Sequence, residues 1–158
     1  MNKILLAVNE SQSSDAAAEI VRGFLQAYPR TEVVVLYVTE MMPDRTGYSS
    51  QFGMRHEREL AFKIQEKLRT TFFKNLMQRV TFEHKQGLAP SKVICQTANE
   101  HGCDLIVVGC EAKRRWFRKL ISGSVSDDVL IHANVPVLLA RRKPDQMAAV
   151  SRIAVLRR

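Results

Sequence analysis

The sequence predicts an α/β protein built on an open five-stranded parallel sheet with helices on both faces. Strand-type and helix-type segments alternate along the chain, which implies right-handed crossover connections. Residues 33–38 and 105–108 are unbroken apolar runs, as expected of parallel strands covered on both faces. The chain has 158 residues, 46% hydrophobic and 25% charged, enough for the core of one ordinary domain.

The first half of the chain is expected to contain two strands, two helices and a long loop. The strands span residues 3–8 and 33–38. A helix between them is indicated by apolar residues at helical spacing, opened by Ser13 or Ser14 as a cap: Ala17, Ile20, Val21, Phe24 and Leu25. Residues 41–54 carry proline and glycine and predict a loop. The second helix is expected over about Arg55 to Arg79, with one apolar stripe formed by Leu60, Ile64, Leu68 and Phe72.

The next segments predict an outer strand, a helix and a buried strand. Residues 80–84 alternate weakly between apolar and polar side chains, which favours a strand at the margin of the sheet. Pro90 stands where a helix begins and Gly102 where it ends. Residues 105–108 then form the fourth strand.

A last helix and a fifth strand complete the predicted sheet. The helix is expected to start at Ser122-Gly123-Ser124 and to use the apolar residues Val125, Val129 and Leu130. The strand spans residues 135–140. Pro136 favours an edge position for this strand, because proline cannot donate a hydrogen bond to a neighbouring strand.

Two segments at the carboxyl ends of strands are candidates for a binding site. In open α/β sheets ligands bind beyond these ends. Asn9-Glu10-Ser11 follows the first strand, and Gly109 follows the fourth, with Gly123-Ser124 further on. Free N–H groups and a hydroxyl at a helix start can hold phosphate. The alternative is purely structural: Gly109 forms a turn and Ser122 or Ser124 caps a helix whose dipole Asp127 and Asp128 already satisfy.

Three segments in this order and spacing resemble the universal stress protein family. They are Ile4 to Ser11, Asn99 to Gly109, and Gly123 to Ser126 continuing to Asn134 to Leu139. The resemblance covers residues 1–142 as one domain and leaves 143–158 as a basic C-terminal extension. It implies a Rossmann-like sheet of order 3-2-1-4-5, a homodimer through the fifth strands, and a role in stress response or signalling. Some members bind ATP and others do not.

The family's nucleotide-binding pattern is matched here in part. Gly109, Gly123 and Ser124 stand at the pattern's positions, but Ala112 replaces its second glycine and the gap from Lys113 to Ser122 is one residue longer. Asn9 replaces the aspartate that reaches adenosine in binding members. The resemblance implies ATP or AMP as the ligand, with Mg²⁺ only for a triphosphate, and a site made of Ala7, Val8, Asn9, Val38, Gly109, Ala112, Lys113, Gly123, Ser124 and Val125.

The formal net charge of +8 is concentrated in one loop and one tail. Residues 113–119 hold five cations around Trp116 and Phe117, and the tail from Arg141 holds six. The rest of the chain has thirteen basic and fifteen acidic residues. The alternative function is therefore a nucleotide-free module that binds an acidic protein partner through loop 113–119 and the tail. Sequence-specific nucleic-acid binding is not expected, because no recognition motif accompanies these charges.

Catalysis, a metal site and a membrane location are not expected. Ser11, Ser13 and Ser14 have no visible His-Asp partners, and the four histidines share no metal-ligand spacing. The apolar runs are too short to cross a bilayer. The start Met1-Asn2-Lys3 leads directly into a strand, and three cysteines form no disulfide pattern. We therefore expect a cytoplasmic protein that is not an enzyme.

Overall fold

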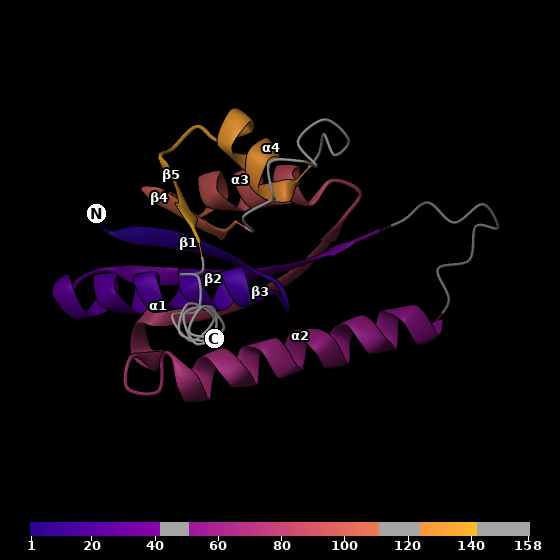
Figure 1. Ribbon diagram of the computed structural model, residues 1–158, viewed down its shortest axis with the longest axis horizontal. Coiled ribbons are helices and arrows are strands. Elements are labelled where there is room, and N and C mark those ends of the chain that lie inside the picture. The colour runs from indigo at the N-terminus through magenta and orange to yellow at the C-terminus, as the bar shows by residue number, and fades with distance from the viewer. Residues whose placement is uncertain (42–50, 111–123, 142–158) are drawn as a thin grey trace, which may run out of the picture.

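The computed structural model describes residues 1–41, 51–110 and 124–141, with the backbone alone at 51–54. Five parallel strands form one sheet of order β3-β2-β1-β4-β5 (Figure 1). This confirms the predicted fold class and strand order. The strands are β1 Lys3–Val8, β2 Glu32–Glu40, β3 Val80–Gly87, β4 Leu105–Gly109 and β5 Val137–Ala140.

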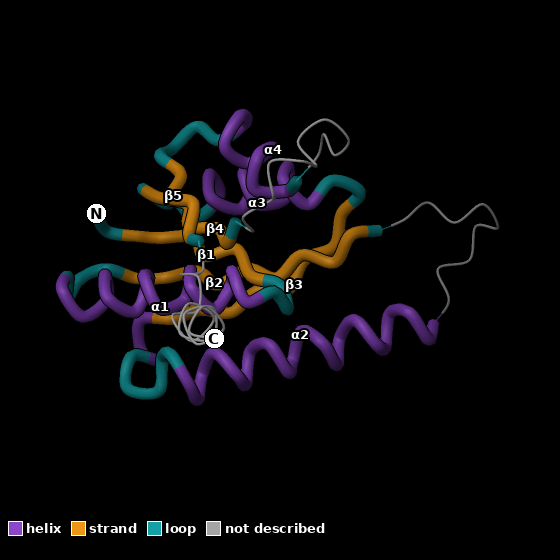
Figure 2. The backbone as a smooth tube through the Cα atoms, viewed as in Figure 1, coloured by secondary structure: helices purple, strands orange, loops and turns teal. Residues whose placement is uncertain are grey.

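Helices cover both faces of the sheet. The elements are α1 Gln12–Ala27, α2 Gln51–Thr71, α3 Pro90–Glu100, α4 Val125–His132 and the short 3₁₀ helix η1 Met77–Arg79. The views in Figures 1 and 2 place α1 and α2 on one face and α3 and α4 on the other. The buried clusters agree, because one contains residues of α1 and α2 and the other contains residues of α3 and α4.

The central strand β1 contributes to both hydrophobic cores. Ile4, Leu6 and Val8 face α1 and α2, whereas Leu5 and Ala7 face α3 and α4, and all five are buried. Side chains of a strand alternate between its two faces, so an unbroken apolar sequence fits a strand that is covered twice. β1 is also paired on both sides, with β2 and with β4. The middle of the sheet is therefore the most enclosed part of the fold.

The second helix differs from its predicted bounds at both ends. It begins at Gln51, four residues before the predicted start at Arg55, and it ends at Thr71, well before Arg79. The backbone N–H groups of Phe72 and Phe73 both donate to the carbonyl of Leu68, at 3.0 Å each. This turn places the Phe73 side chain fully inside the α1–α2 core. Burial of one aromatic ring thus ends a helix that the apolar spacing alone would have continued.

The helix ends follow the capping rules, with one correction. Ser11, and not Ser13 or Ser14, is the N-cap of α1, and its Oγ accepts from the Ser14 N–H at 3.3 Å. Ser13 and Ser14 are buried in the first turn. The predicted end of α3 at Gly102 is confirmed, since this residue has φ of 60° and its N–H donates to the Asn99 carbonyl at 3.1 Å.

The C-terminal helix and strand agree with prediction apart from Val125, Leu130 and the strand start. Val129 is fully buried, but Val125 is 36% and Leu130 51% exposed, and neither joins the core as predicted. The sheet confirms the edge position of β5, which starts at Val137 and not at residue 135. Pro136 directly precedes it, and its carbonyl accepts from the Ile106 N–H at 3.0 Å. Residues 113–119 and 143–158 lie outside the described part of the chain.

Candidate functional site

A cavity of about 880 Å³ opens at the edge of the sheet where β1, β2 and β4 end. Its wall also includes the starts of α1, α3 and α4. This convergence follows from the topology, because in a parallel sheet each crossover helix starts near the carboxyl end of the strand before it. We refer to it as the carboxyl-edge cavity.

Seven of the ten residues predicted for the site line this cavity. They are Ala7, Val8, Asn9, Val38, Gly109, Ser124 and Val125. The other three, Ala112, Lys113 and Gly123, lie outside the described residues. The structure therefore brings the ends of β1, β2 and β4 together with the start of α4, which lies more than a hundred positions from Asn9 in the sequence.

One side of the cavity is apolar. Leu36 and Val38 of β2, Ile94 of α3 and Val108 of β4 form this side, with Pro90 at the start of α3. Leu36 is fully buried and Ile94 nearly so, which means that the surface is fixed by the core behind it. A flat apolar ring system fits such a surface, since its burial would remove further apolar area from water.

Asn9 is held rigidly at the middle of the wall, just beyond β1. The Asn9 Oδ1 accepts from the Ser11 N–H at 2.9 Å and from the Ser14 hydroxyl at 2.7 Å. The Asn9 N–H in turn donates to the Ser14 Oγ at 2.9 Å. Because Ser14 is 4% exposed, this network is anchored in the body of the protein and fixes the orientation of the Asn9 amide.

Serine hydroxyl groups contribute much of the polar lining of the cavity. Ser124 is the N-cap of α4, and its Oγ accepts from the Asp127 N–H at 3.2 Å. The same Oγ lies 2.9 Å from the Ser126 Oγ. At the start of α1, the Ser11 and Ser13 hydroxyls are 2.7 Å apart, and both residues also line the cavity. Ser124 thus caps a helix and also lines the cavity, so the two interpretations of its sequence position are compatible.

Position 109 requires glycine for a packing reason that the sequence did not reveal. A Cβ at this position would lie 2.5 Å from the Ser13 carbonyl carbon and 2.7 Å from the Ser14 nitrogen. The first turn of α1 therefore packs directly on the end of β4. The glycine is required by this packing whether or not a ligand also approaches it.

Several residues of the cavity wall were missed by sequence reasoning. Glu40, Pro90, Ser126 and Arg141 line the cavity although none was predicted to do so. Pro90 could have been found from the topology, since α3 starts at the same sheet edge. Arg141 follows β5 directly, but its place on the wall depends on how β5 pairs with β4, which no local pattern specifies.

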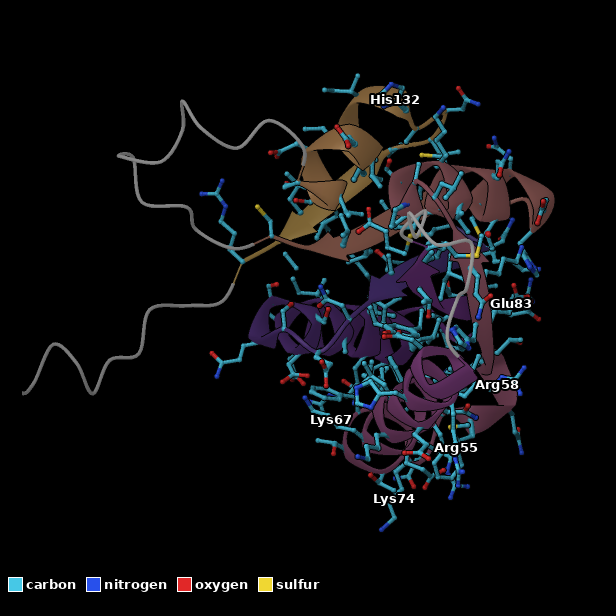
Figure 3. The ribbon with its side chains drawn as sticks, turned by 90° about the vertical axis from the view of Figure 1, so that its right-hand side faces the viewer. Arg55, Arg58, Lys67, Lys74, Glu83 and His132 are labelled. Atoms are coloured by element: carbon cyan, nitrogen blue, oxygen red, sulfur yellow. The ribbon has the colours of Figure 1, made fainter. Side chains whose placement is uncertain are left out.

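The described wall carries charges of both signs. Glu40 and Asp127 contribute carboxylates and Arg141 a guanidinium. The basic side chains Arg55, Arg58, Lys67 and Lys74 lie on the α2 side of the molecule, away from His132 of α4 (Figure 3). None of these four cations lines the cavity.

A second polar cluster joins α2 to the sheet. The Tyr37 hydroxyl donates to the Glu57 Oε2 at 2.9 Å, and the Thr39 hydroxyl donates to the same oxygen at 3.1 Å. The His84 Nε2 lies 2.8 Å from the Thr39 Oγ1. Burial, together with the Glu57 carboxylate, raises the pKa of Tyr37 to about 12. The cluster ties α2 to β2 and β3 and takes no part in the carboxyl-edge cavity.

Neither a metal-binding cluster nor a membrane-spanning helix occurs in the described part of the chain. Within residues 1–41, 51–110 and 124–141, no three His, Cys, Asp or Glu side chains gather closely enough to hold a metal ion. None of the helices described is both long and apolar enough to span a membrane. Cys103 packs in the α3–α4 core, where burial raises the pKa of its thiol to about 11.

The chain is similar to known proteins over nearly its full length. Residues 1–141 match the model of the universal stress protein family. The chain is 26% identical over 156 residues to universal stress protein MJ0577 of Methanocaldococcus jannaschii, covering 89% of this chain and 95% of the relative. A solved structure of MJ0577 gives a TM-score of 0.66 at 22% identity and covers 91% of this chain and 98% of that one.

Two other solved structures share the fold. One is a universal stress protein family protein of Arabidopsis thaliana with AMP bound, with a TM-score of 0.57 at 23% identity over 92% of this chain and 95% of that one. The other is a universal stress protein of Archaeoglobus fulgidus in complex with dAMP, with a TM-score of 0.61 at 18% identity over 89% and 97%. With most of its residues matched by the family model, the chain belongs to the universal stress protein family.

Proposed function

We propose that the carboxyl-edge cavity binds an adenine nucleotide, AMP or ATP, and that the protein is a cytoplasmic stress-response or signalling module. The observation that carries this proposal is the composition of the cavity. One continuous space of about 880 Å³ is lined by apolar side chains at the ends of β2 and β4 and by serine hydroxyls at the starts of α1 and α4. A nucleotide has the same division between an apolar base and an anionic phosphate.

The strand order suggests how the ligand lies. β2, β1 and β4 are neighbours in that order. The apolar Val38 belongs to β2, Asn9 follows β1, and Gly109 ends β4 beside the start of α4. A base against Val38 and a phosphate near Gly109, Ser124 and Val125 would leave the sugar at Asn9. Ala7 and Val8 would form the floor, with Ala112, Lys113 and Gly123 in the segment between β4 and α4.

The structural relatives support a nucleotide as the ligand. The Arabidopsis thaliana structure contains AMP and the Archaeoglobus fulgidus structure contains dAMP, and both share this fold. The described wall here offers serine hydroxyls and carboxylates but no His or Lys. We therefore propose a binding protein and not an enzyme. Mg²⁺ would be needed only with a triphosphate, whose charge it would offset.

Titration calorimetry with AMP and ATP tests this function. We expect saturable binding to the full chain that Ser124→Ala weakens about tenfold, because the hydroxyl at the phosphate end is lost. Ser124→Thr keeps the hydroxyl and the helix cap and is the matched control, so it should retain binding. Absence of binding to both nucleotides would contradict the proposal. The function would then fall to the alternative, an acidic protein partner of loop 113–119 and the tail.

We also propose that the protein forms a homodimer along β5. This strand is at the edge of the sheet, and Val137, Leu138 and Leu139 are only half-buried in the single chain. Light scattering should give the mass of two chains. Hydrogen exchange at the β5 amides should slow as protein concentration rises, because pairing would protect them. A monomer mass at all concentrations would contradict this arrangement.

A further inference from the structure

We propose that Asn9 directs the carboxyl-edge cavity toward adenine nucleotides that carry a phosphate on the 3′ side of the ribose. The inference deepens the proposed function and rests on it. It concerns the chemical groups that the middle of the cavity wall offers to the sugar. The hydrogen bonds of Asn9 define these groups.

The identity of the two terminal atoms of Asn9 follows from their partners. The backbone N–H of Ser11 can only donate, so the atom 2.9 Å from it must be the amide oxygen. Ser14 Oγ already accepts from the Asn9 N–H, which leaves its own hydrogen to donate to the same oxygen at 2.7 Å. Both contacts therefore assign the oxygen to the side of α1.

The amide nitrogen is consequently the atom that Asn9 offers to the cavity. The hydrogen bonds found between the Asn9 side chain and other described residues are made by its oxygen, and Asn9 is exposed on the cavity wall. The amide nitrogen carries two hydrogens and accepts none. The middle of the wall thus presents hydrogen-bond donors, and it brings no negative charge there.

A hydrogen-bond donor at this place favours a ribose that carries a phosphate, whereas a carboxylate would favour a ribose with free hydroxyls. A ribose hydroxyl can accept a neutral hydrogen bond from the Asn9 amide nitrogen. Its own hydrogen finds no acceptor on Asn9, because the Asn9 oxygen is already engaged by Ser11 and Ser14. A phosphate oxygen only accepts, and a bond from N–H to an anionic oxygen is stronger than one to a neutral hydroxyl. The carboxylates of the described wall, Glu40 and Asp127, come from β2 and α4 and not from the position of Asn9.

The test compares three ligands on the full chain: AMP, 2′-deoxy-AMP and adenosine 3′,5′-bisphosphate. For the wild type we expect the added 3′-phosphate to tighten binding about threefold or more. Loss of the 2′-hydroxyl should change affinity by less than about twofold, because Asn9 can give that hydroxyl only a neutral hydrogen bond and offers no acceptor for its hydrogen.

Asn9→Asp is the decisive variant. The aspartate keeps an oxygen for Ser11 and Ser14 and places a second oxygen where the amide nitrogen was. We expect it to reverse the order, so that the 3′-phosphate weakens binding by about tenfold relative to the wild type and loss of the 2′-hydroxyl becomes costly. Asn134→Asp is the matched control, because it adds the same charge in the exposed segment before β5, at the opposite end of the sheet.

Ser14→Ala provides an independent check on positioning. Without the hydroxyl the Asn9 amide can rotate, and we expect the preference for the 3′-phosphate to fall toward equal binding. Chemical unfolding of each variant shows that it is folded. If no nucleotide binds to any variant, the proposed function itself is wrong. If the wild type binds AMP but Asn9→Asp leaves the ratio between AMP and the bisphosphate unchanged, the function stands and the role of Asn9 is refuted.

Discussion

Gly109 shows how much one missing side chain can determine. Its Cα lies so close to the first turn of α1 that an added Cβ would be 2.5 Å from backbone atoms of Ser13. Backbone cannot move aside as the end of a flexible side chain can. The same turn holds Ser14 and, through it, Asn9. The position of the Asn9 amide therefore depends on a glycine that belongs to another strand.

Gly109→Ala should destabilise the protein by about 2 to 3 kcal/mol, the usual cost of overpacking. Chemical denaturation measures the change. Gly23→Ala is the matched control, since Gly23 is exposed within α1 and an added Cβ there meets nothing within 4 Å. That variant should be more stable by about 0.5 to 1 kcal/mol, because alanine favours the helix. Equal effects of the two substitutions would contradict the close packing at β4.

Residue-level prediction from sequence succeeded where chemistry is local. Ser124 as a helix cap and Gly102 as a helix end follow from rules that involve a few neighbouring positions. The reason for Gly109 is not local, because the atoms that exclude its Cβ belong to Ser13, nearly a hundred positions earlier. The donor character of Asn9 likewise becomes visible only when Ser11 and Ser14 are seen to occupy its oxygen.

At the scale of elements, α2 is attached to the sheet through the hydroxyl groups of β2. Tyr37 and Thr39 both donate to the Glu57 carboxylate, so the early part of α2 is tied to the carboxyl end of β2. The end of this strand also supplies Val38 and Glu40 to the cavity wall. Residues 37–40 at the end of β2 thus both hold α2 through hydrogen bonds and contribute to the wall of the cavity.

Glu57→Gln should lower the pKa of Tyr37 from about 12 part of the way toward 10, because the carboxylate is removed but the burial remains. Because the folded protein keeps the Tyr37 phenol neutral, the raised pKa contributes to the stability of the fold. This contribution is complete below pH 10 and is lost as the pH rises toward 12. Ultraviolet titration of tyrosine ionisation measures the shift. Tyr28→Phe, which removes the hydroxyl of an exposed tyrosine, should leave the Tyr37 transition in place.

Asp104 joins the amino ends of β1 and β4. Its Oδ2 accepts from the backbone N–H groups of Asn2 and, at 3.0 Å, Lys3, and these bonds lower the pKa of the carboxyl. A lowered pKa contributes stability above the pKa of the unfolded chain, and this contribution is lost as pH falls through the folded value.

Asp104→Asn should therefore flatten the loss of stability below about pH 4, since an amide does not titrate in this range. Urea unfolding at a series of acidic pH values measures the slope. Glu59→Gln on α2 serves as the control, because Glu59 is exposed and pairs with Arg55 one turn earlier, away from Asp104 in the sequence. If Glu59→Gln changed the dependence of stability on pH as much as Asp104→Asn does, the role assigned to Asp104 would be refuted.

Prediction of whole elements was limited by tertiary contacts. The apolar stripe Leu60, Ile64 and Leu68 identified α2, but its end depends on where Phe73 finds space in the core. Leu130 has the spacing of an inward-facing residue, yet α4 has only eight residues and turns that side chain outward. Local pattern determines which segments become helices, whereas packing determines where they stop and which side they bury.

At the scale of the whole molecule, the sheet separates two cores that share the same strands. Leu25 of α1 and Ile94 of α3 lie in different cores, on opposite faces. Because β1 belongs to both, neither core can remain intact after the other has lost the sheet. The strand alternation visible in the sequence was enough to predict this layered arrangement. The cavity could be placed from the same topology.

Leu25→Ala and Ile94→Ala should each destabilise the protein by about 2 to 5 kcal/mol, as expected for cavities in a core. In each variant we expect far-ultraviolet circular dichroism and tyrosine fluorescence to report one coincident transition. Separate transitions would show that the two faces unfold independently. Phe62→Ala, on the exposed side of α2, is the control and should change stability little.

The central place of β1 has a consequence for the order in which a ribosome delivers this chain. Ile4 pairs with Val33 on one side and with Leu105 on the other. After β2 has been made, some seventy further residues must be synthesised before β4, the second neighbour of β1, exists. During that interval one of its edges is open to other nascent chains, and a chaperone that covers it would be most useful then.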